Sequence, residues 1–488
     1  MIVKVQRMLT RILRVHPIIV ITIIMVLGDF GLFIMDLFFG EERGVIFGYN
    51  LVRLIITTNS IVVGILSLIW ITKYLVRARK GKVTIVIIYL LGNVLCVVGL
   101  IIGYRLLEPI VAFNVIFLFS WLVVGLSRGA ALAKNMTVAI FSFLFTIFLV
   151  EVMFYIIIKI NSRPGVYAYD EKSDILFRTD SIQGYAHNKL VTANLKKILV
   201  DEVNQDTSYV FHTTIHVDSI GNRITAIPYM TNRDKYAIFI GCSVTFGLGV
   251  EDDETLPYYF AQYDSGYCAY NFGVGGYGPQ NVLALLSNYN LKKFVKQDSG
   301  VCIYSYIKHH VYRAIGDMAT YTAWGESLPY YDYELGKLIR VGSFGSDRRL
   351  ISGFYTLMSK SNFVRYFKLN FPPKLTARHY KISCDMIRQT RDLYRQQFNN
   401  DNFYVMIMPT NFDQPMIDCL SEYGVKIIDV SKLFASSNLA SMDSSAIKDL
   451  YFIPHDGHPT PLAYRLIAGQ LADQLERRTE LRNNVNPE

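Results

Sequence analysis

Five long apolar stretches fill roughly the first 160 residues and limit what this chain can fold into. A helix needs about 20 predominantly apolar residues to cross a bilayer. The stretches that approach this length are 17–39, 54–75, 83–104, 109–127 and 137–159. An apolar content of 51% is also high for a wholly soluble chain of 488 residues. We therefore predict an α-helical membrane region of about five spans, or four if the closely spaced third and fourth stretches form one.

The basic residues of this region predict its orientation. They gather before the first stretch, between the second and third, and between the fourth and fifth, while segments 40–53 and 104–109 carry no net charge. Cytoplasmic loops of membrane proteins carry an excess of Lys and Arg. We expect a protein integral to a bacterial-type cytoplasmic membrane, with a cytoplasmic N-terminus and an extracytoplasmic C-terminal domain.

The positive charge of the chain belongs to this topology. Residues 1–160 hold 15 of the 49 basic and 6 of the 40 acidic residues, which leaves 34 of each in the remainder. The remainder is therefore neutral. Because phosphate neutralisation supplies most of the affinity for nucleic acids, we exclude a nucleic-acid partner.

Acidic side chains and cysteines in the sequence give no further site. Asp29, Asp36 and Glu151 fall within predicted spans, where we expect each to face another helix or an interface. The six cysteines show no C-x-x-C spacing, so they indicate neither a zinc site nor a redox motif. One disulfide is compatible with the five that lie outside the spans, but the sequence does not specify the pair.

Beyond residue 160, buried strands alternate with helices. We predict strands at 236–241, 267–273, 300–307, 402–409 and 424–430, helices at 254–263, 279–294, 378–398, 413–423 and 461–478, and a loop-rich region at 314–376. Apolar strands separated by helices indicate a parallel sheet covered on both faces. Ligands bind such sheets at the carboxyl ends of the strands.

Three residues with the chemistry of a nucleophile, a base and an acid occur in this part. Ser243, in "FIGCSVTFG", directly follows the first buried strand. Asp456 and His458 stand two apart in "FIPHDGHPT", just before the last predicted helix. A serine nucleophile requires a base that takes its proton and an acid that orients the base. Each segment alone is also compatible with an ordinary turn or helix start.

Taken together, the segments "GCSVTFGLGVEDDETLP", "NFGVGGYGPQN" and "DGHPTPLAYRLIA" resemble the SGNH hydrolases, or GDSL-like lipase/acylhydrolase superfamily. The resemblance covers roughly 180–478 and includes the lead-in segments "IQGYAHNKL" and "VDSIGNRIT". It implies a three-layer α/β domain with a flavodoxin-like parallel sheet, a Ser243–His458–Asp456 triad, and an oxyanion hole formed by the amides of Ser243 and Gly276. It requires no metal or other cofactor.

The chain departs from the family pattern at three places. Cys242 stands where most members have Asp, and we interpret it as a packed neighbour. Asp456 and His458 are separated by one residue rather than two, a form found among polysaccharide-modifying members. Segment 304–313 lacks the family's Asn. His309 and His310 are the candidates for its oxyanion role, and we favour His310 over a purely structural role for that residue.

Two other families are weaker matches. "GVGGYG" at 273–278 fits a dinucleotide-binding G-x-G-x-x-G, but the acid about 20 residues on, Asp298, precedes its strand instead of ending it. An α/β-hydrolase elbow, G-x-S-x-G, would need glycine where the chain has Thr245.

These observations predict four segments: membrane helices at 1–160, a β-rich lead-in at 161–234, an SGNH hydrolase-like domain at 235–478 and a polar tail at 479–488. We expect a membrane-anchored serine esterase that acts on O-acyl (acetyl) esters of cell-surface glycans or on small esters. An O-acyltransferase, a lipase, and a non-catalytic glycan-binding or assembly module are the alternatives. A membrane partner that supplies acyl groups or exports glycan would fit this location.

Overall fold

The structure, a computed structural model, describes residues 45–46, 49–50, 131–161, 165–171, 175–227, 232–434 and 444–485. The chain divides into two compact units, one of residues 1–161 with 356–368 and one of 162–355 with 369–488. Four of the five predicted spans, at 17–39, 54–75, 83–104 and 109–127, lie outside the described residues. The short strands β1 (Val45–Ile46) and β2 (Tyr49–Asn50) pair antiparallel.

In the first unit, helix α6 (Ala131–Asn161) includes the fifth predicted span. Glu151 of α6 accepts hydrogen bonds from Ser361 Oγ at 2.5 Å and from the Asn362 amide at 2.6 Å. This amide begins helix α14 (Asn362–Tyr366), whose N-terminus favours a negative charge. Glu151 therefore has protein partners, as the sequence predicts for an interface carboxylate. Within the described ranges, no helix is long and apolar enough to cross a membrane.

The second unit contains the predicted parallel sheet. Its five strands are all parallel and lie in the order β14-β13-β10-β8-β9. The strands are β8 (Lys235–Gly241), β9 (Tyr267–Gly273), β10 (Ser299–Tyr306), β13 (Phe403–Ile407) and β14 (Lys426–Asp429). Counted along the chain this is the order 2-1-3-4-5, which is the flavodoxin-like arrangement. The order reverses between β8 and β10, so the carboxyl end of β8 lies at the switch point where such sheets bind ligands.

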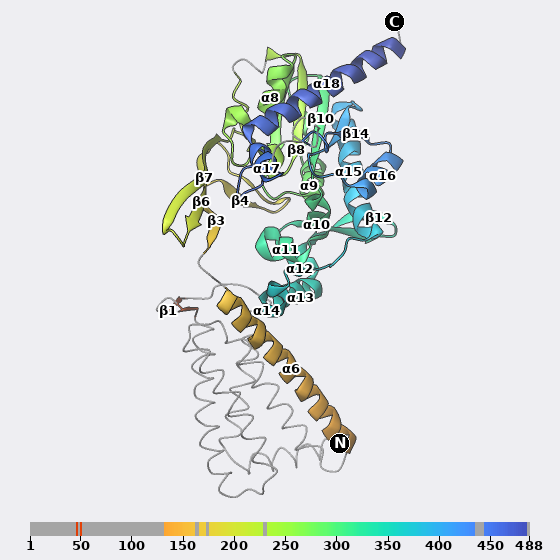
Figure 1. Cartoon of the computed structure of the whole chain (residues 1–488). Helices are drawn as coiled ribbons and strands as arrows, with labels where there is room; N and C mark the ends of the chain where they lie inside the picture. The colour runs from red at the N-terminus through yellow and green to blue at the C-terminus, as the bar shows by residue number, and fades with distance from the viewer. Residues whose placement is uncertain are drawn as a thin grey trace, which may run out of the picture. The chain divides into compact units, whose positions relative to one another are not determined.

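Helices cover both faces of this sheet, as predicted (Figure 1). One face packs against α8 (Leu256–Tyr263) and α18 (Pro461–Val485), and the other against α9 (Pro279–Asn288), α15 (Ala377–Phe398) and α16 (Gln414–Glu422). Two boundaries differ from the sequence prediction by more than two residues. Helix α9 ends before the short 3₁₀ turn at Leu291–Lys293. Helix α18 continues over most of the predicted polar tail, since neither Gly nor Pro interrupts residues 479–485.

A disulfide joins Cys384 of α15 to Cys419 of α16. The sequence left this pairing open, because the partners become neighbours only when both helices pack on the sheet. Cys242, Cys268 and Cys302 are free and buried.

The loop-rich prediction for 314–376 is wrong. This region contains a β-hairpin and several short helices: α11 (Met318–Thr320), a π-helical turn at Tyr321–Gly325, β11 (Pro329–Glu334), β12 (Lys337–Ser343), α12 (Phe344–Asp347), α13 (Arg349–Lys360) and α14. The hairpin turns at Leu335 and Gly336, both with positive φ. A two-residue turn of this kind usually begins with Asn, Asp or Gly, so a leucine there concealed the hairpin.

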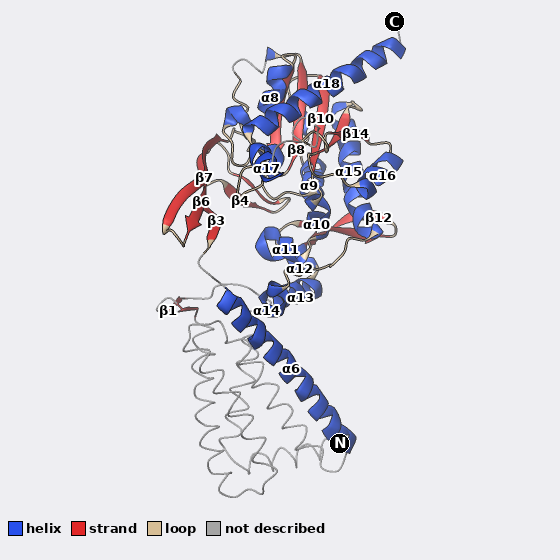
Figure 2. Cartoon of the chain, in the orientation of Figure 1, coloured by secondary structure: helices blue, strands red, loops and turns tan. Residues whose placement is uncertain are grey.

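The lead-in forms an antiparallel sheet of its own, drawn in red beside the central sheet in Figure 2. Its strand order is β3-β6-β7, and a separate hairpin pairs β4 with β5. The strands are β3 (Val166–Glu171), β4 (Phe177–Asp180), β5 (Gly184–His187), β6 (Thr192–Asp201) and β7 (Asp206–His216). The remaining elements are α7 (Ser243–Phe246), a 3₁₀ turn at Asp252–Glu254, α10 (His309–Ile315) and α17 (Ser444–Tyr451).

Candidate active site

The turn after β8 places Ser243 at the carboxyl edge of the sheet. Ser243 begins the one-turn helix α7 (Ser243–Phe246), and Gly247 caps its end in the left-handed conformation (φ 86°). This turn packs so closely on β9 that a Cβ at Gly273 would lie 2.3 Å from the Phe246 amide nitrogen. Only glycine fits there, and the close contact fixes the direction in which the Ser243 side chain leaves the turn.

The loop between α17 and α18 carries the histidine and the aspartate. Phe452 and Pro459 form a bridge that closes the loop, and the Ile453 amide donates to the His458 carbonyl at 2.8 Å. Gly457 lies between the two side chains with φ 90°, a conformation that glycine adopts without strain. This tight turn lets Asp456 Oδ1 accept from the His458 amide at 3.1 Å and lie 2.5 Å from His458 Nδ1.

The fold brings the three predicted residues into one chain of hydrogen bonds. Ser243 Oγ lies 2.8 Å from His458 Nε2, although 215 positions separate them. Ser243 is 7% exposed, and the Asp456 side chain is 2% exposed. The arrangement has the form of a nucleophile, a base that can take its proton, and a buried carboxylate that orients the base.

Lys197 of β6 is a further partner of the carboxylate. Its Nζ donates to Asp456 Oδ2 at 2.8 Å, while His458 occupies Oδ1. Burial by itself would raise the pKa of Asp456, but the hydrogen bonds and charges of His458 and Lys197 outweigh burial and lower it to about 2. The carboxylate is therefore ionised at neutral pH and accepts hydrogen bonds with both oxygens.

The glycine block at 273–278 forms a loop at the end of β9, beside the turn that begins with Ser243. We name it the oxyanion loop after the role predicted for Gly276. Tyr185 Oη of β5 donates to the Gly275 carbonyl at 2.6 Å, and Trp324 Nε1 donates to the Gly276 carbonyl at 3.3 Å. In a trans peptide the carbonyl and the next amide point in opposite directions. Tyr185 therefore sets the direction of the Gly276 N–H, and Trp324 fixes the following peptide unit.

Arg223 holds the end of the nucleophile turn, the segment 243–247 that carries the candidate nucleophile Ser243. Its guanidinium is almost fully buried and donates to the carbonyls of Phe246, Gly247 and Val250 at 3.0, 2.5 and 2.7 Å. Its Nε donates to Asp252 at 2.8 Å. A positive charge at the C-terminus of a helix satisfies carbonyls that have no partner within the helix.

His310 occupies a different environment from the triad. Its ring is fully buried, Nδ1 lies 2.9 Å from Tyr304 Oη, and the rings of Tyr304 and Tyr306 pack against it. Burial lowers the pKa of His310 well below its usual value, so the ring is neutral. None of its contacts among the described residues joins it to Ser243 or His458. The oxyanion role of His310 stays a prediction that this packing does not support.

The dinucleotide alternative is not supported by the positions of its residues. The block 273–278 follows β9 at the carboxyl edge of the sheet. Asp298 immediately precedes β10, at the opposite edge, where its exposed side chain pairs with Lys292. An acid in this position cannot meet a ribose bound at the glycine block.

Sequence reasoning missed Tyr185, Lys197, Arg223 and Trp324 as parts of the site. Tyr185 and Arg223 fall within the two lead-in segments that resemble the family, so a weak signal existed for them. Lys197 stands next to Lys196 in an ordinary strand, and Trp324 lies in the region predicted as loop. Nothing in their spacing marks either one.

No family model and no curated protein matches this chain. Solved structures similar to it include a member of the lipolytic protein G-D-S-L family from Veillonella parvula, 12% identical, with a TM-score of 0.28 over 50% of this chain and 99% of that one. Another is an acetyl xylan esterase (Est2A) from the rumen bacterium Butyrivibrio proteoclasticus, 8% identical, with a TM-score of 0.29 over 65% of this chain and 99% of that one. Scores this low assign no family to this chain.

Proposed function

We propose that this protein is a serine esterase of the SGNH superfamily that acts on O-acyl esters of cell-surface glycans, acetyl being the simplest acyl group. The observation that carries the proposal is the 2.8 Å contact between Ser243 Oγ and His458 Nε2, with Asp456 behind the imidazole. A turn serine and a solvated loop histidine without a shared catalytic role are not expected to lie at hydrogen-bond distance, with a buried carboxylate on the far side of the imidazole.

In the proposed reaction, Ser243 Oγ attacks the ester carbonyl carbon while His458 Nε2 takes the hydroxyl proton. The negative charge that develops on the carbonyl oxygen is stabilised by the amides of Ser243 and Gly276. Each such donor is worth about 3–4 kcal/mol of barrier in measured enzymes. His458 then gives the proton to the leaving alcohol, and an acyl-serine remains. Water attacks this ester in a second cycle, which releases the acid and restores Ser243.

We also propose that the domain lies outside a bacterial-type cytoplasmic membrane. The apolar stretches and the distribution of basic residues support this location. The Cys384–Cys419 disulfide is a second support, because disulfides persist mainly in oxidising compartments. From there the site would meet glycans made or exported at the membrane, and a membrane partner could supply acyl groups or substrate.

The same groups would serve an O-acyltransferase if a sugar hydroxyl replaced water in the second cycle. The two activities differ only in the group that accepts the acyl chain, since the acyl-serine is common to both. A non-catalytic glycan-binding or assembly module is the alternative from another class, and the missing Asn of segment 304–313 is its only support in the sequence.

The test uses the full chain purified in detergent and p-nitrophenyl acetate as substrate. We expect Ser243→Ala to remove activity and Asp456→Asn to lower kcat by about 10⁴-fold, because asparagine favours the wrong imidazole tautomer. Ser421→Ala, the same substitution at an exposed position on α16, is the matched control. Equal rates for wild type and Ser243→Ala would reject the enzyme. Ester formation on an added oligosaccharide would identify the transferase.

A further inference from the structure

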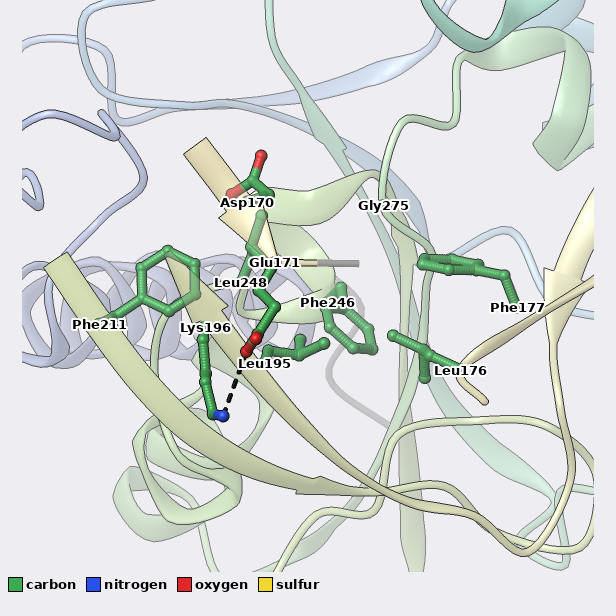
Figure 3. A pocket seen from close by; sticks show the side chains of 10 residues that line it. All are labelled: Asp170, Glu171, Leu176, Phe177, Leu195, Lys196, Phe211, Phe246, Leu248 and Gly275. Carbon is green, nitrogen blue, oxygen red and sulfur yellow. Dashed lines mark ion pairs between the residues drawn. The ribbon is translucent and has the colours of Figure 1, made fainter. Parts of the chain in front are cut away.

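An apolar cavity lies between the lead-in sheet and the nucleophile turn. Its volume is about 470 Å³. Side chains from several elements line it, among them Leu195 of β6, Phe211 of β7, Phe246 of α7 and Phe177 of β4 (Figure 3). We infer that this cavity holds the acyl chain of the ester, and that the chain is of medium length rather than acetyl. The inference rests on the acyl transfer proposed for Ser243.

The cavity adjoins the proposed reacting groups on two sides. Phe246 follows Ser243 by three positions in α7, and residues with this spacing have Cβ atoms about 5–6 Å apart on a helix. Gly275, another lining residue, directly precedes Gly276. An acyl group bound to Ser243 therefore begins within a few ångströms of the cavity wall.

The wall has the chemistry of a site for hydrocarbon and not for sugar. The charged residues at the cavity are Asp170, Glu171 and Lys196. Lys196 Nζ pairs with Glu171 at 3.1 Å, and Asp170 Oδ1 lies 3.6 Å from Lys197 Nζ, so these groups already have partners. The side chains of Glu171 and Asp170 are 50% and 68% exposed, so both carboxylates lie at the rim of the cavity. A sugar against the apolar side chains of the wall would lose water hydrogen bonds that these side chains cannot replace.

The position relative to His458 favours the acyl part of the ester over the alcohol part. The leaving oxygen must lie within reach of His458 Nε2, which gives it a proton. None of the described lining residues comes from the loop 452–460 that carries His458. Phe246 and Leu248, which follow Ser243 in its turn, and Gly275, which precedes Gly276, do line it. The alcohol therefore leaves past His458, and the acyl chain extends the other way.

The volume also indicates more than an acetyl group. The cavity is about sixteen times the ~30 Å³ that a water molecule occupies in the liquid. It falls within the range of about 300–1,000 Å³ typical of sites for organic ligands. An acetyl methyl would leave most of the apolar wall without contact, whereas a longer hydrocarbon chain would cover more of it.

The test measures kcat/KM of the full chain for p-nitrophenyl acetate, butyrate, hexanoate and octanoate. We expect kcat/KM to rise about fourfold with each methylene that becomes buried. Leu195→Phe, which fills the cavity, should lower the ratio of octanoate to acetate kcat/KM about tenfold. Phe177→Ala, which removes a half-exposed side chain from the wall, should move the optimum to a longer chain. Leu350→Phe, the same exchange on the exposed face of α13, is the matched control.

The acyl-pocket inference fails if wild type prefers acetate and neither variant changes the ratio of octanoate to acetate rates. It also fails if Leu195→Phe lowers all four substrates equally while thermal unfolding is unchanged. Both results leave the proposed esterase intact as long as Ser243→Ala abolishes hydrolysis. If Ser243→Ala instead hydrolyses every ester as fast as wild type does, the proposed esterase itself is rejected.

Discussion

The parallel-sheet domain and the β-rich lead-in contribute to the candidate site in different ways. The sheet domain carries every group proposed to react, namely Ser243, Asp456, His458 and the Gly276 amide. The lead-in carries none of these groups, yet Tyr185, Lys197 and Arg223 hold the oxyanion loop, the carboxylate and the nucleophile turn. The chemistry and the support of the site are thus encoded in separate segments of the chain.

The two regions also differ in burial. Six of the seven residues of β8 are buried, whereas β3 has no buried residue. Segments with few buried apolar contacts open at a lower free-energy cost than the core of a domain. We expect amide hydrogen exchange to be faster in β3 than in β8. A protein that loses the lead-in contacts would keep its sheet but lose the orientation of the site.

Replacing the buried lead-in arginine should have the largest effect. Arg223→Met leaves Asp252 without its buried partner and removes a charged donor from three carbonyls, two of which keep only a single longer hydrogen bond. We expect the free energy of unfolding, measured in urea, to fall by about 3–5 kcal/mol. His216→Asn is the control, because His216 pairs with the same carboxylate from a half-exposed position. Equal losses for the two variants would show that burial of Arg223 is unimportant.

Removing the disulfide of the parallel-sheet domain should lower the stability of the protein and leave its activity unchanged. Cys384 and Cys419 are 35 positions apart, so the double replacement Cys384→Ala with Cys419→Ala should cost about 2–4 kcal/mol of unfolding free energy. Neither cysteine contacts a site residue, and kcat/KM for p-nitrophenyl acetate should stay within twofold. A large loss of activity in the folded variant would contradict the division between the two regions.

Removing the lead-in lysine should change the response to acid. The pKa of Asp456 lies below its ordinary value, so the ionised carboxylate stabilises the fold above about pH 4, and this contribution is lost as the pH falls toward about 2. Lys197→Met removes one cause of the low pKa. We expect about 1–2 kcal/mol less stability at pH 7 and loss of the remaining contribution at a higher pH. Unfolding between pH 2 and 7 measures both.

Lys196→Met is the control for this experiment, since Lys196 pairs with the half-exposed Glu171. An exposed pair contributes about 0–1 kcal/mol. If both lysine variants show the same acid response, Lys197 does not hold the Asp456 carboxylate in solution.

Removing one lead-in hydroxyl should have the smallest effect. Tyr185→Phe deletes the donor to the Gly275 carbonyl and leaves the ring in place. A neutral hydrogen bond is worth about 1 kcal/mol, so kcat should fall roughly three- to tenfold. KM should change little, because the oriented Gly276 amide acts on charge that develops in the transition state. Tyr209→Phe, at an exposed position of β7, is the control. A change confined to KM would contradict this role for Tyr185.

Periodic apolar strands and short motifs were enough to predict the core. Residues 236–241 are apolar on both faces of the strand, as expected for a strand that helices cover on both sides. This pattern can be recognised from the segment alone. The D-G-H turn and the C-S-V-T-F-G turn are likewise local, since glycine and small residues are required where the chain bends sharply. The hairpin at 329–343 was missed because Leu335 occupies a turn position that leucine rarely adopts.

The sequence by itself determined the parallel sheet, its order of strands and helices, and the three residues most suited to nucleophilic chemistry. Only the tertiary structure decided which side chains hold them: Lys197 against Asp456, Arg223 beneath the nucleophile turn, and Tyr185 at the oxyanion loop. It also decided the Cys384–Cys419 pairing and the apolar cavity. The reason is physical. Strand periodicity and turn chemistry depend on neighbours in the sequence, whereas a buried charge or a cavity depends on which distant surfaces pack together.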